Sequence, residues 1–286
     1  MPPELEGYRT ISQIGVGARS TINLVMRVAG GQRFALKHVV RRSAEDDRFI
    51  QQAEVEYEVT HDLSHPVLRK SHQIDRTRKW FKVTELLLLM EYVEGRTLEQ
   101  ARPTDLGTAI DIFRQVAGGL DALHEAGYVH ADIKPNNIML TGEGRVKIID
   151  FGQSCRIGQK KERIQGTPDY IAPEQVRRMP LDRRTDLFNL GATMYWVLTN
   201  RPYPTDIQPD AKPGGYQIAG PKVAPKDLVR SIPEALSKLV MECCAKRPDK
   251  RPADMKQLIA RLDVAEQMWR RASADSRSDA AGERAR

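Results

Sequence analysis

The sequence has few cysteines, no long apolar run and no leader of the secretory type. Among its 286 residues are three cysteines, Cys155, Cys243 and Cys244, too few and too poorly spaced for a disulfide framework or a four-ligand zinc site. The run "LLLLM" at 86–90 stops at Glu91, far short of the ~20 apolar residues that a membrane span needs. The start, "MPPELEGY", lacks the basic and apolar regions of a signal peptide. We therefore expect a cytoplasmic protein without a membrane span.

The charged residues limit the kinds of partner that this protein can have. The formal net charge at pH 7 is +7, but the lysines and arginines are spread over several segments and aromatic residues do not alternate with them. A single-strand binder combines a basic groove with aromatic stacking platforms, so we expect no nucleic-acid partner. The hydrophobic fraction of 40% and the charged fraction of 29% are those of an ordinary folded domain, which argues against overall disorder.

Local patterns divide the chain into a strand-rich part and a helical part. Residues 8–40 and the segment "WFKVTELLLLMEYVEG" at 80–95 are rich in β-branched, aromatic and aliphatic residues beside glycine turns, and both predict strands. Between them, residues 44–63 place apolar side chains at helical spacing and predict one helix. From residue 104 onward helical periods dominate. The sequence therefore predicts an α+β fold, with a small lobe of strands before a larger, mainly helical lobe.

A glycine-containing segment, "IGVGARSTI" from Ile14 to Ile22, lies between two predicted strands. Glycine lets backbone N–H groups approach a phosphate closely, because a side chain would block both the approach and the backbone angles that it needs. Gly15 and Gly17 are therefore candidates for phosphate contact. Ser20 stands where a third glycine is expected, and an ordinary hairpin with glycines at its turn also fits the segment.

The next strand, "RFALKHVV", contains a lysine that needs a counter-charge if it faces inward. Lys37 and Ala35 are two residues apart and lie on the same face of the strand. Glu56 can supply the counter-charge, because it shares a face of the predicted helix with Ala53 and Val59. A lysine that points into solvent is the alternative for such a strand.

The segment "VHADIKPNN", residues 129–137, combines acidic, basic and amide side chains between a predicted helix and a predicted strand. A carboxylate at Asp132 can accept the proton of a hydroxyl, Lys134 can hold a phosphoryl oxygen, and the amide oxygen of Asn137 can ligate a divalent metal. Asp150 of "IIDFG" follows beyond the strand and offers a second carboxylate to the same cleft. Taken alone, the segment also fits a polar surface loop.

In this order and at this spacing, the motifs resemble those of eukaryotic-type (Hanks-type) Ser/Thr protein kinases, which include bacterial members. The resemblance covers residues 8–267 and includes "GTPDYIAPE" at 166–174. By this resemblance, Glu174 is expected to pair with Arg251, and Asp186 is expected to anchor the catalytic loop.

The resemblance implies a bilobal protein-kinase-like fold and sets its boundaries. The small antiparallel β lobe with its one major helix is expected at residues 1–92, the larger helical lobe at 93–271 and a disordered tail at 272–286. Ser273 of "RRAS", at the edge of this tail, is a candidate for autophosphorylation. The alternative, which the pattern favours, is a solvated helix end with arginines at the helix terminus.

The resemblance also implies an ATP-dependent enzyme that uses Mg²⁺ to transfer the γ-phosphoryl group to Ser or Thr hydroxyls of protein substrates. The implied catalytic residues are Asp132 as the base, Lys134 and Lys37. The implied metal ligands are Asn137 and Asp150. The implied nucleotide-binding residues are Ile14, Gly15, Gly17, Ile22, Ala35, Lys37, Glu56, Met90 as the gatekeeper, Glu91 and Val93 in the hinge, and Leu140.

Two other functions share part of this pattern. A small-molecule phosphotransferase of the aminoglycoside type also has a His-x-Asp loop, but Lys134 and "GTPDYIAPE" resemble kinases that act on proteins. A pseudokinase that serves as an ATP-binding scaffold is the more serious alternative. Against it, the residues expected to handle phosphate and metal are all present: Lys37, Asp132, Asn137 and Asp150. Phosphate transfer to a generic protein would separate these functions.

Three residues depart from the kinase pattern. Ser20 replaces the third glycine of the phosphate loop. Thr60, one turn after Glu56, replaces an apolar residue, which weakens the expected support of that helix and points to a regulatory protein on the small lobe. Ala131 replaces the arginine of the usual His-Arg-Asp triplet, giving His-Ala-Asp. Because that arginine normally holds a phosphate of the activation loop, we expect that phosphorylation of residues 153–171 is not the main switch.

Overall fold

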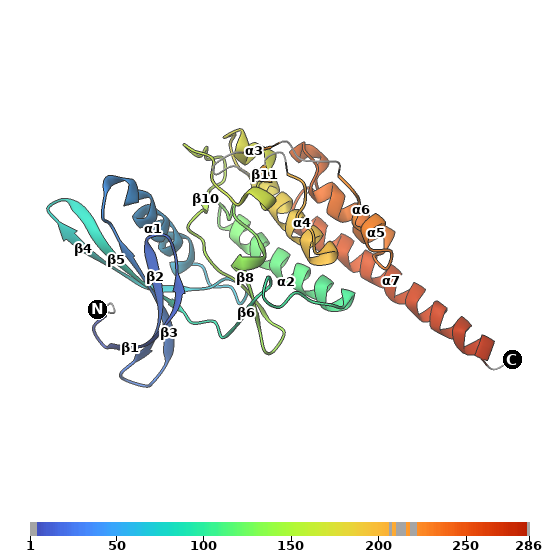
Figure 1. The fold of residues 1–286 in the computed structure, drawn as a ribbon, viewed down its shortest axis with the longest axis horizontal. Helices are drawn as coiled ribbons and strands as arrows, with labels where there is room; N and C mark the ends of the chain where they lie inside the picture. The colour runs from blue at the N-terminus through green and yellow to red at the C-terminus, as the bar shows by residue number, and fades with distance from the viewer. Residues whose placement is uncertain (1–4, 206–207, 210–215, 218–221, 285–286) are drawn as a thin grey trace.

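The structure, a computed structural model, describes residues 5–205, 208–209, 216–217 and 222–284 and has two lobes (Figure 1). The small lobe is a five-stranded antiparallel sheet in the order β1-β2-β3-β5-β4 with one long helix, α1. The strands are β1 Tyr8–Val16, β2 Ser20–Arg27, β3 Arg33–Val40, β4 Ser71–Lys79 and β5 Lys82–Glu91. Helix α1 spans Asp47–His61 and follows a 3₁₀ turn, η1, at Ala44–Asp46.

Helix α1 packs on one face of this sheet because both surfaces are apolar. A single hydrophobic cluster joins them and contains Ala35, Val39, Ile50, Ala53, Leu86, Leu88 and Met90. Alternate residues of a strand share a face, so Lys37 lies on the same face as Ala35 and Val39. The packing of α1 therefore brings the residues of its buried side toward Lys37.

The large lobe is mainly helical and is built around α2, Leu106–Glu125, and α4, Arg183–Thr199. Helix α4 is buried on nearly all sides, as expected for a helix in the middle of a lobe. A Cβ added to its Gly191 would lie 2.6 Å from Cβ of Cys243, so glycine permits the close approach of α6. The other helices are α3 Pro173–Val176, α5 Pro225–Leu228, α6 Glu234–Cys243 and α7 Met255–Arg284.

Short strands and 3₁₀ turns hold the loops that face the small lobe. Strands β6 Gly95–Thr97, β8 Ile138–Thr141 and β9 Val146–Ile148 form one sheet, β7 Tyr128–Val129 pairs with β10 Cys155–Arg156, and β11 Gln208–Pro209 pairs with β12 Tyr216–Gln217. The turns η2 Pro135–Asn137, η3 Pro168–Tyr170 and η4 Pro248–Lys250 all begin with proline, which presets the backbone for a helical turn. The catalytic loop thus runs from β7 to β8, and both of its ends are fixed in sheets.

The predicted bilobal α+β fold is confirmed, with a small antiparallel β lobe that carries one major helix and a mainly helical large lobe. The domain boundaries at residues 92 and 271 stay predictions. Helix α7 continues to Arg284, whereas the sequence predicts a disordered tail at 272–286; this stretch contains five alanines and three arginines, which favour helix. The side chain of Ser273 lies outside the described part of the structure. Every described helix is too short or too polar to cross a membrane.

Candidate active site

Lys37 on β3 and Glu56 on α1 form a buried ion pair. Lys37 Nζ lies 2.7 Å from Glu56 Oε2, and Glu56 is 1% exposed. Arg69, which lies between α1 and β4, donates to the other oxygen of the same carboxylate. Burial alone would raise the pKa of Glu56, but the charges of Lys37 and Arg69 hold it well below its usual range. Burial also opposes the charge of Lys37, yet Glu56 and Asp150 raise its pKa. Both groups are therefore charged at neutral pH.

The sheet places five of the eleven expected nucleotide-binding residues on one face. The strand register pairs Gly15 with Ile22, Ile22 with Lys37, and Ala35 with Met90. Residues directly opposite each other in neighbouring strands share a face, and Ala35 and Lys37 are two positions apart in one strand. The structure therefore brings these five residues together on the side of the sheet that α1 partly covers.

The glycine turn between β1 and β2 is tight. Gly17 N donates to the Ser20 carbonyl at 2.7 Å, and a Cβ on Gly17 would lie 2.6 Å from Ser20 Oγ. Ser20 therefore fills the space beside the second glycine, and a larger residue at position 17 would require the Ser20 hydroxyl to move. Ile14 precedes this turn on β1 and is 46% exposed.

The hinge expected at Glu91 and Val93 connects β5 with β6. The Glu91 carboxylate pairs with Lys147 on β9 at 2.7 Å and accepts a hydrogen bond from Lys70 N at 3.2 Å. Val93 leads into β6, which pairs with β8, the strand that carries Leu140. The ion pair therefore ties the small lobe to the sheet that holds Leu140.

Asp186 on α4 fixes the backbone of the catalytic loop. Its carboxylate accepts hydrogen bonds from the backbone N–H groups of His130 and Ala131, both at 2.8 Å. The same carboxylate lies 2.8 Å from His124 Nε2, and all four residues are buried. Ala131 has a φ of 62°, a left-handed conformation that is unfavourable for a residue other than glycine. The bonds to Asp186 hold the loop in this conformation.

The carboxylate of Asp132 meets a hydroxyl and an ammonium group. Its Oδ1 accepts a hydrogen bond from Thr167 Oγ1 at 2.9 Å, and its Oδ2 accepts one from Lys134 Nζ at 2.9 Å. Asn137 Nδ2 donates to the Asp132 carbonyl at 2.9 Å and to Oδ2 at 3.2 Å. Asp132 is thus placed to accept a hydrogen bond from an aliphatic hydroxyl, the contact that precedes proton transfer to a general base.

Asn137 and Asp150 offer oxygen atoms that suit a divalent metal. Ile149 N donates to the Asn137 carbonyl at 2.9 Å, so the chain holds Asp150 next to Asn137. Because Nδ2 of Asn137 faces Asp132, its amide oxygen points away from Asp132 and is available as a ligand. Carboxylate and amide oxygens are the hard ligands that Mg²⁺ prefers, so the chemistry of this pair fits a divalent cation.

The space beside Ala131 is apolar, where the kinase pattern has an arginine. Val129, Ala131, Cys155 and Leu181 form a small buried hydrophobic cluster. A phosphate on the activation loop would find no fixed cation in this cluster. The four side chains of the cluster thus offer no charge to a loop phosphate, but Lys161 of the same loop interacts with Cys155, and the expectation that loop phosphorylation is not the main switch stays a prediction.

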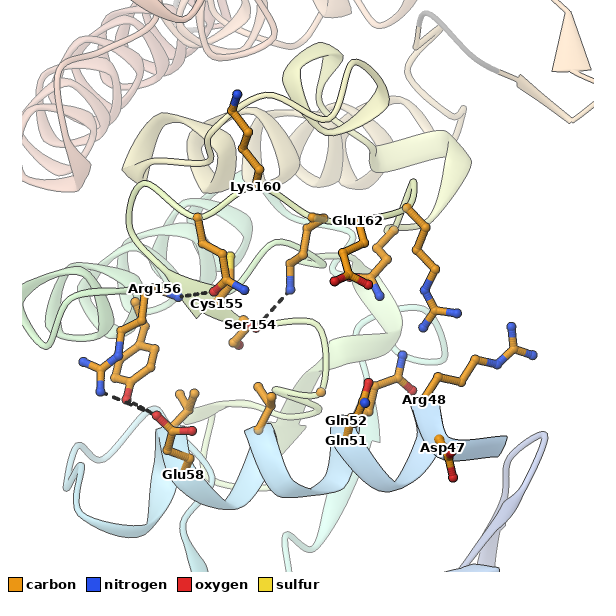
Figure 2. Close-up of a pocket in the computed structure, with 18 of the residues that line it drawn as sticks. Asp47, Arg48, Gln51, Gln52, Glu58, Ser154, Cys155, Arg156, Lys160 and Glu162 are labelled. Atoms are coloured by element: carbon orange, nitrogen blue, oxygen red, sulfur yellow. Dashed lines mark hydrogen bonds and ion pairs between the residues drawn. The ribbon is translucent and has the colours of Figure 1, made fainter. Parts of the chain in front are cut away.

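Lys161 binds two backbone carbonyls of the activation loop to which it belongs. Its ammonium donates to the carbonyls of Gln153 at 2.9 Å and Ser154 at 3.1 Å, and burial lowers the pKa of Lys161. This part of the loop lines a cleft of about 820 Å³ opposite α1, where Figure 2 shows Ser154 across from Gln52. A lysine therefore anchors the start of the loop next to Asp150.

Thr60 and Ser71 form a polar contact behind α1. Thr60 Oγ1 lies 2.7 Å from both the Glu56 carbonyl and Ser71 Oγ, and Thr60 and Ser71 are each 1% exposed. The sequence predicts weak support of the helix at Thr60, because an apolar residue is usual there. In the structure a hydrogen bond to Ser71 replaces that apolar packing.

Three contributors to the site are missed by sequence reasoning: Arg69, Ser71 and Lys161. The only local signal for Arg69 is a charge directly after the apolar pair Val67 and Leu68. Lys161 has no signal beyond its place among several loop cations. The other expected contact of the large lobe is present, with Glu174 and Arg251 joined by two hydrogen bonds of 2.7 and 2.9 Å.

Comparisons with known proteins agree with this geometry. The family model of the protein kinase domain matches residues 8–262. A probable serine/threonine-protein kinase of Clostridium acetobutylicum is 27% identical over 264 residues, which cover 89% of this chain and 39% of the relative. A probable serine/threonine-protein kinase of Clostridium perfringens is 33% identical over 62% of this chain and 27% of its own length. Serine/threonine-protein kinase PknL of Mycobacterium tuberculosis is 29% identical over 91% of this chain and 66% of its own length.

The first two relatives are much longer than the segment they share with this chain, which spans 39% and 27% of their lengths. The family model, in contrast, covers most of this chain, from the first strand of the small lobe to the first turns of α7. The chain therefore belongs to the protein kinase family.

Proposed function

We propose that this chain is an ATP-dependent protein kinase that phosphorylates Ser and Thr hydroxyls of proteins. The observation that carries the proposal is the contact of Asp132 Oδ1 with the Thr167 hydroxyl at 2.9 Å, beside the ammonium of Lys134. A substrate hydroxyl in that position would meet a proton acceptor and a cation at once. The curated relatives are named as serine/threonine kinases, which supports the same acceptor type.

Membership of the family implies ATP and a divalent metal, and we assign Mg²⁺ as that metal. Asn137 and Asp150 would hold it through oxygen atoms. The bound metal would neutralise phosphate charge and orient the γ-phosphoryl group. Gly15 and Gly17 would cover the phosphates, while Ile22, Ala35, Met90, Glu91, Val93 and Leu140 would surround the adenine.

The chain's own residues would then act mainly by position. Glu56 and Arg69 keep the ammonium of Lys37 fixed, so that it can hold the phosphates without moving during the reaction. Asp132 accepts the proton of the attacking hydroxyl. Lys134, 2.9 Å from Asp132, would stabilise the negative charge on the transferred group.

Regulation and cellular location are proposed from the polar contact behind α1 and from the buried cysteines. The polar contact between Thr60 and Ser71 behind α1 replaces apolar packing of this helix, so a regulatory protein on the small lobe would have a position on which to act. Cys155, Cys243 and Cys244 are buried free thiols, which fits the reducing cytoplasm. The proposed substrates are proteins that present a Ser or Thr hydroxyl as the acceptor.

The decisive experiment separates a kinase from an ATP-binding scaffold. Asp132→Asn should lower the rate of phosphate transfer to a generic protein substrate by ~10² to 10⁴ and leave the affinity for Mg²⁺-ATP within about threefold. Asp227→Asn, an exposed aspartate of α5, is the matched control and should change neither. A wild-type protein that binds ATP and transfers no phosphate would show that the chain is a scaffold.

A further inference from the structure

The tip of the β4–β5 hairpin exposes two aromatic side chains within a basic segment. Trp80 is 87% exposed and Phe81 is 97% exposed, more than any other large hydrophobic residue in the described part of the chain. They lie within "RTRKWFK", residues 76–82, which contains four cations and no acidic residue. Such a combination at one turn needs an explanation, because aromatic side chains are usually at least partly buried.

The conformation of this tip is unfavourable in water in two further respects. Trp80 has a φ of 59°, a left-handed conformation that is uncommon for a bulky residue. Lys79 lies directly opposite Lys82 across the hairpin, and like charges in that position repel each other. Glycine and asparagine are the usual residues at such turns, so this tip is poorly suited to water alone.

The position of the tip leaves it accessible and away from the catalytic residues. Strand β4 is an edge strand of the sheet, and the hairpin reaches the end of the small lobe that is farthest from the large lobe (Figure 1). The side chains that flank the aromatic pair, Arg78, Lys79 and Lys82, are exposed. A partner at this tip would not cover Asp132 or the hinge.

We propose that this tip docks on a membrane surface rich in anionic phospholipids. Tryptophan and other aromatic rings are favoured at the level of lipid headgroups, where one part of the ring is in an apolar region and its polar edge is in water. Lysine and arginine beside them are attracted to anionic headgroups. Trp80 and Phe81 would enter the headgroup region while Arg78, Lys79 and Lys82 contact phosphate and carboxylate groups.

The size and shape of the tip favour a membrane over a protein partner. Two aromatic side chains bury ~300–500 Å² together, below the roughly 800 Å² per partner of a stable protein interface. The remainder of the hairpin cannot add much apolar area, because β4 is polar from Asp75 to Lys79. A convex tip needs no matching groove when it enters a lipid surface.

The first experiment measures sedimentation of the full chain with vesicles of phosphatidylcholine, alone or mixed with phosphatidylserine. The wild type should sediment with the mixed vesicles, and less so as salt is added. Both W80S/F81S and K79S/K82S should weaken this binding by about tenfold.

Matched controls are available in the same chain. V28S removes another exposed apolar side chain, 73% exposed, at the other side of the sheet. K238S/K250S removes two exposed lysines of the large lobe, and so changes the net charge as much as K79S/K82S does. Both controls should bind the vesicles like the wild type.

The second experiment uses Trp80 itself as the probe. Trp80 is exposed, while Trp196 and Trp269 are partly buried, so insertion should shift the fluorescence of the wild type to shorter wavelength when anionic vesicles are added. W80F should keep most of the vesicle binding and lose this shift. Equal midpoints of urea unfolding for the wild type and W80S/F81S would show that the variant is folded.

The membrane proposal fails if the wild type does not bind phosphatidylserine vesicles, if W80S/F81S binds them equally, or if the emission of Trp80 does not change. Recovery of a protein through Trp80 in the absence of lipid binding would also overturn it. These outcomes do not depend on catalysis, so they leave the proposed kinase activity untouched.

Discussion

The catalytic loop and the back of helix α1 are both buried, but different kinds of contact hold them. In the catalytic loop, Asp186 binds backbone N–H groups, so these contacts do not use the side chain at position 131. Behind α1, side chains contact other side chains: Arg69 binds Glu56, and Thr60 contacts Ser71. Ala131 therefore departs from the kinase pattern without a compensating residue in the described part of the chain. Thr60 departs from it together with Ser71, which supplies a hydrogen-bond partner.

The largest effect is expected at the backbone anchor. Asp186→Asn replaces a carboxylate oxygen with an NH₂ group that faces a backbone donor, and it leaves at least one buried N–H without an acceptor. The free energy of unfolding should fall by about 3 kcal/mol, and phosphate transfer should be nearly lost. Urea denaturation and a transfer assay measure the two effects.

Asp182→Asn is the control for this change. Asp182 caps the same helix by accepting from Arg184 N, and asparagine caps a helix about as well as aspartate. Equal stabilities of the two variants would mean that Asp186 does not anchor the loop.

The second prediction tests the side-chain contacts behind α1. Arg69→Met leaves the Glu56 carboxylate with Lys37 alone and should lower the free energy of unfolding by about 2–3 kcal/mol. Arg76→Met is the matched control, because the Arg76–Glu54 pair, at 2.8 Å, joins β4 to α1 at the surface; surface pairs contribute only about 0.5 kcal/mol.

Arg69→Met should also change how the free energy of unfolding depends on pH. The pKa of Glu56 is lowered to about 2 from an ordinary value of 4.5, so its contribution is complete above the ordinary value and is lost as pH falls through the folded value. Without Arg69 the folded pKa rises, and acid unfolding should begin at higher pH than in the wild type. Unfolding midpoints measured from pH 6 down to pH 2 on the two proteins test this sign; a shift to lower pH would contradict it.

The third prediction tests whether Thr60 and Ser71 contribute to the free energy of unfolding as a coupled pair or independently. Thr60→Val should lower the free energy of unfolding by about 1–2 kcal/mol, because it leaves the buried Ser71 hydroxyl without its partner. Ser71→Ala should lower it by less, because Thr60 Oγ1 keeps the Glu56 carbonyl as a hydrogen-bond partner at 2.7 Å. The double variant removes both hydroxyls and should cost about 1 kcal/mol less than the sum. Strict additivity in a double-mutant cycle would show that the contact between Thr60 and Ser71 is not coupled.

The smallest effect on stability is expected at Lys161. Lys161→Met removes two hydrogen bonds to the start of the activation loop and should slow phosphate transfer by about three- to tenfold, or about 1 kcal/mol of barrier. The free energy of unfolding should change by less than about 0.5 kcal/mol. Lys160→Met, at the exposed neighbouring position, should change neither quantity.

Phosphatase treatment of the wild type adds an independent check of the same loop. The rate should stay within about twofold once mass spectrometry shows that the loop carries no phosphate. A drop of more than about tenfold would mean that phosphate, and not Lys161, controls the loop.

Much of the site could be predicted from the sequence because its contacts depend on local periodicity. The alternation in β3 places Lys37 beside Ala35, the helical period of α1 places Glu56 toward it, and the two side chains meet at 2.7 Å. Asp132, Lys134 and Asn137 lie within six positions of one another, so one loop conformation brings them together.

The contacts that the sequence did not predict join segments that only tertiary packing brings together. Arg69 reaches Glu56 from a connection between elements, where a charged residue is ordinarily read as solvent-exposed. Thr60 is recognisable as a departure, but its partner Ser71 comes eleven positions later on another element. In α7, the polar composition predicts disorder, while its helix-forming residues allow the helix to continue to Arg284.

The distance along the chain between the catalytic loop and its anchor also determines when the site can form during synthesis. Asp186 is 56 positions after His130, and Arg251 is 77 positions after Glu174. At about 5–20 residues per second, a ribosome needs roughly 3–11 s to supply Asp186 after it has finished His130. A nascent chain that ends between them would already contain Asp132, Lys134 and Asn137 in full, but it would lack the carboxylate that accepts hydrogen bonds from the backbone N–H groups of His130 and Ala131.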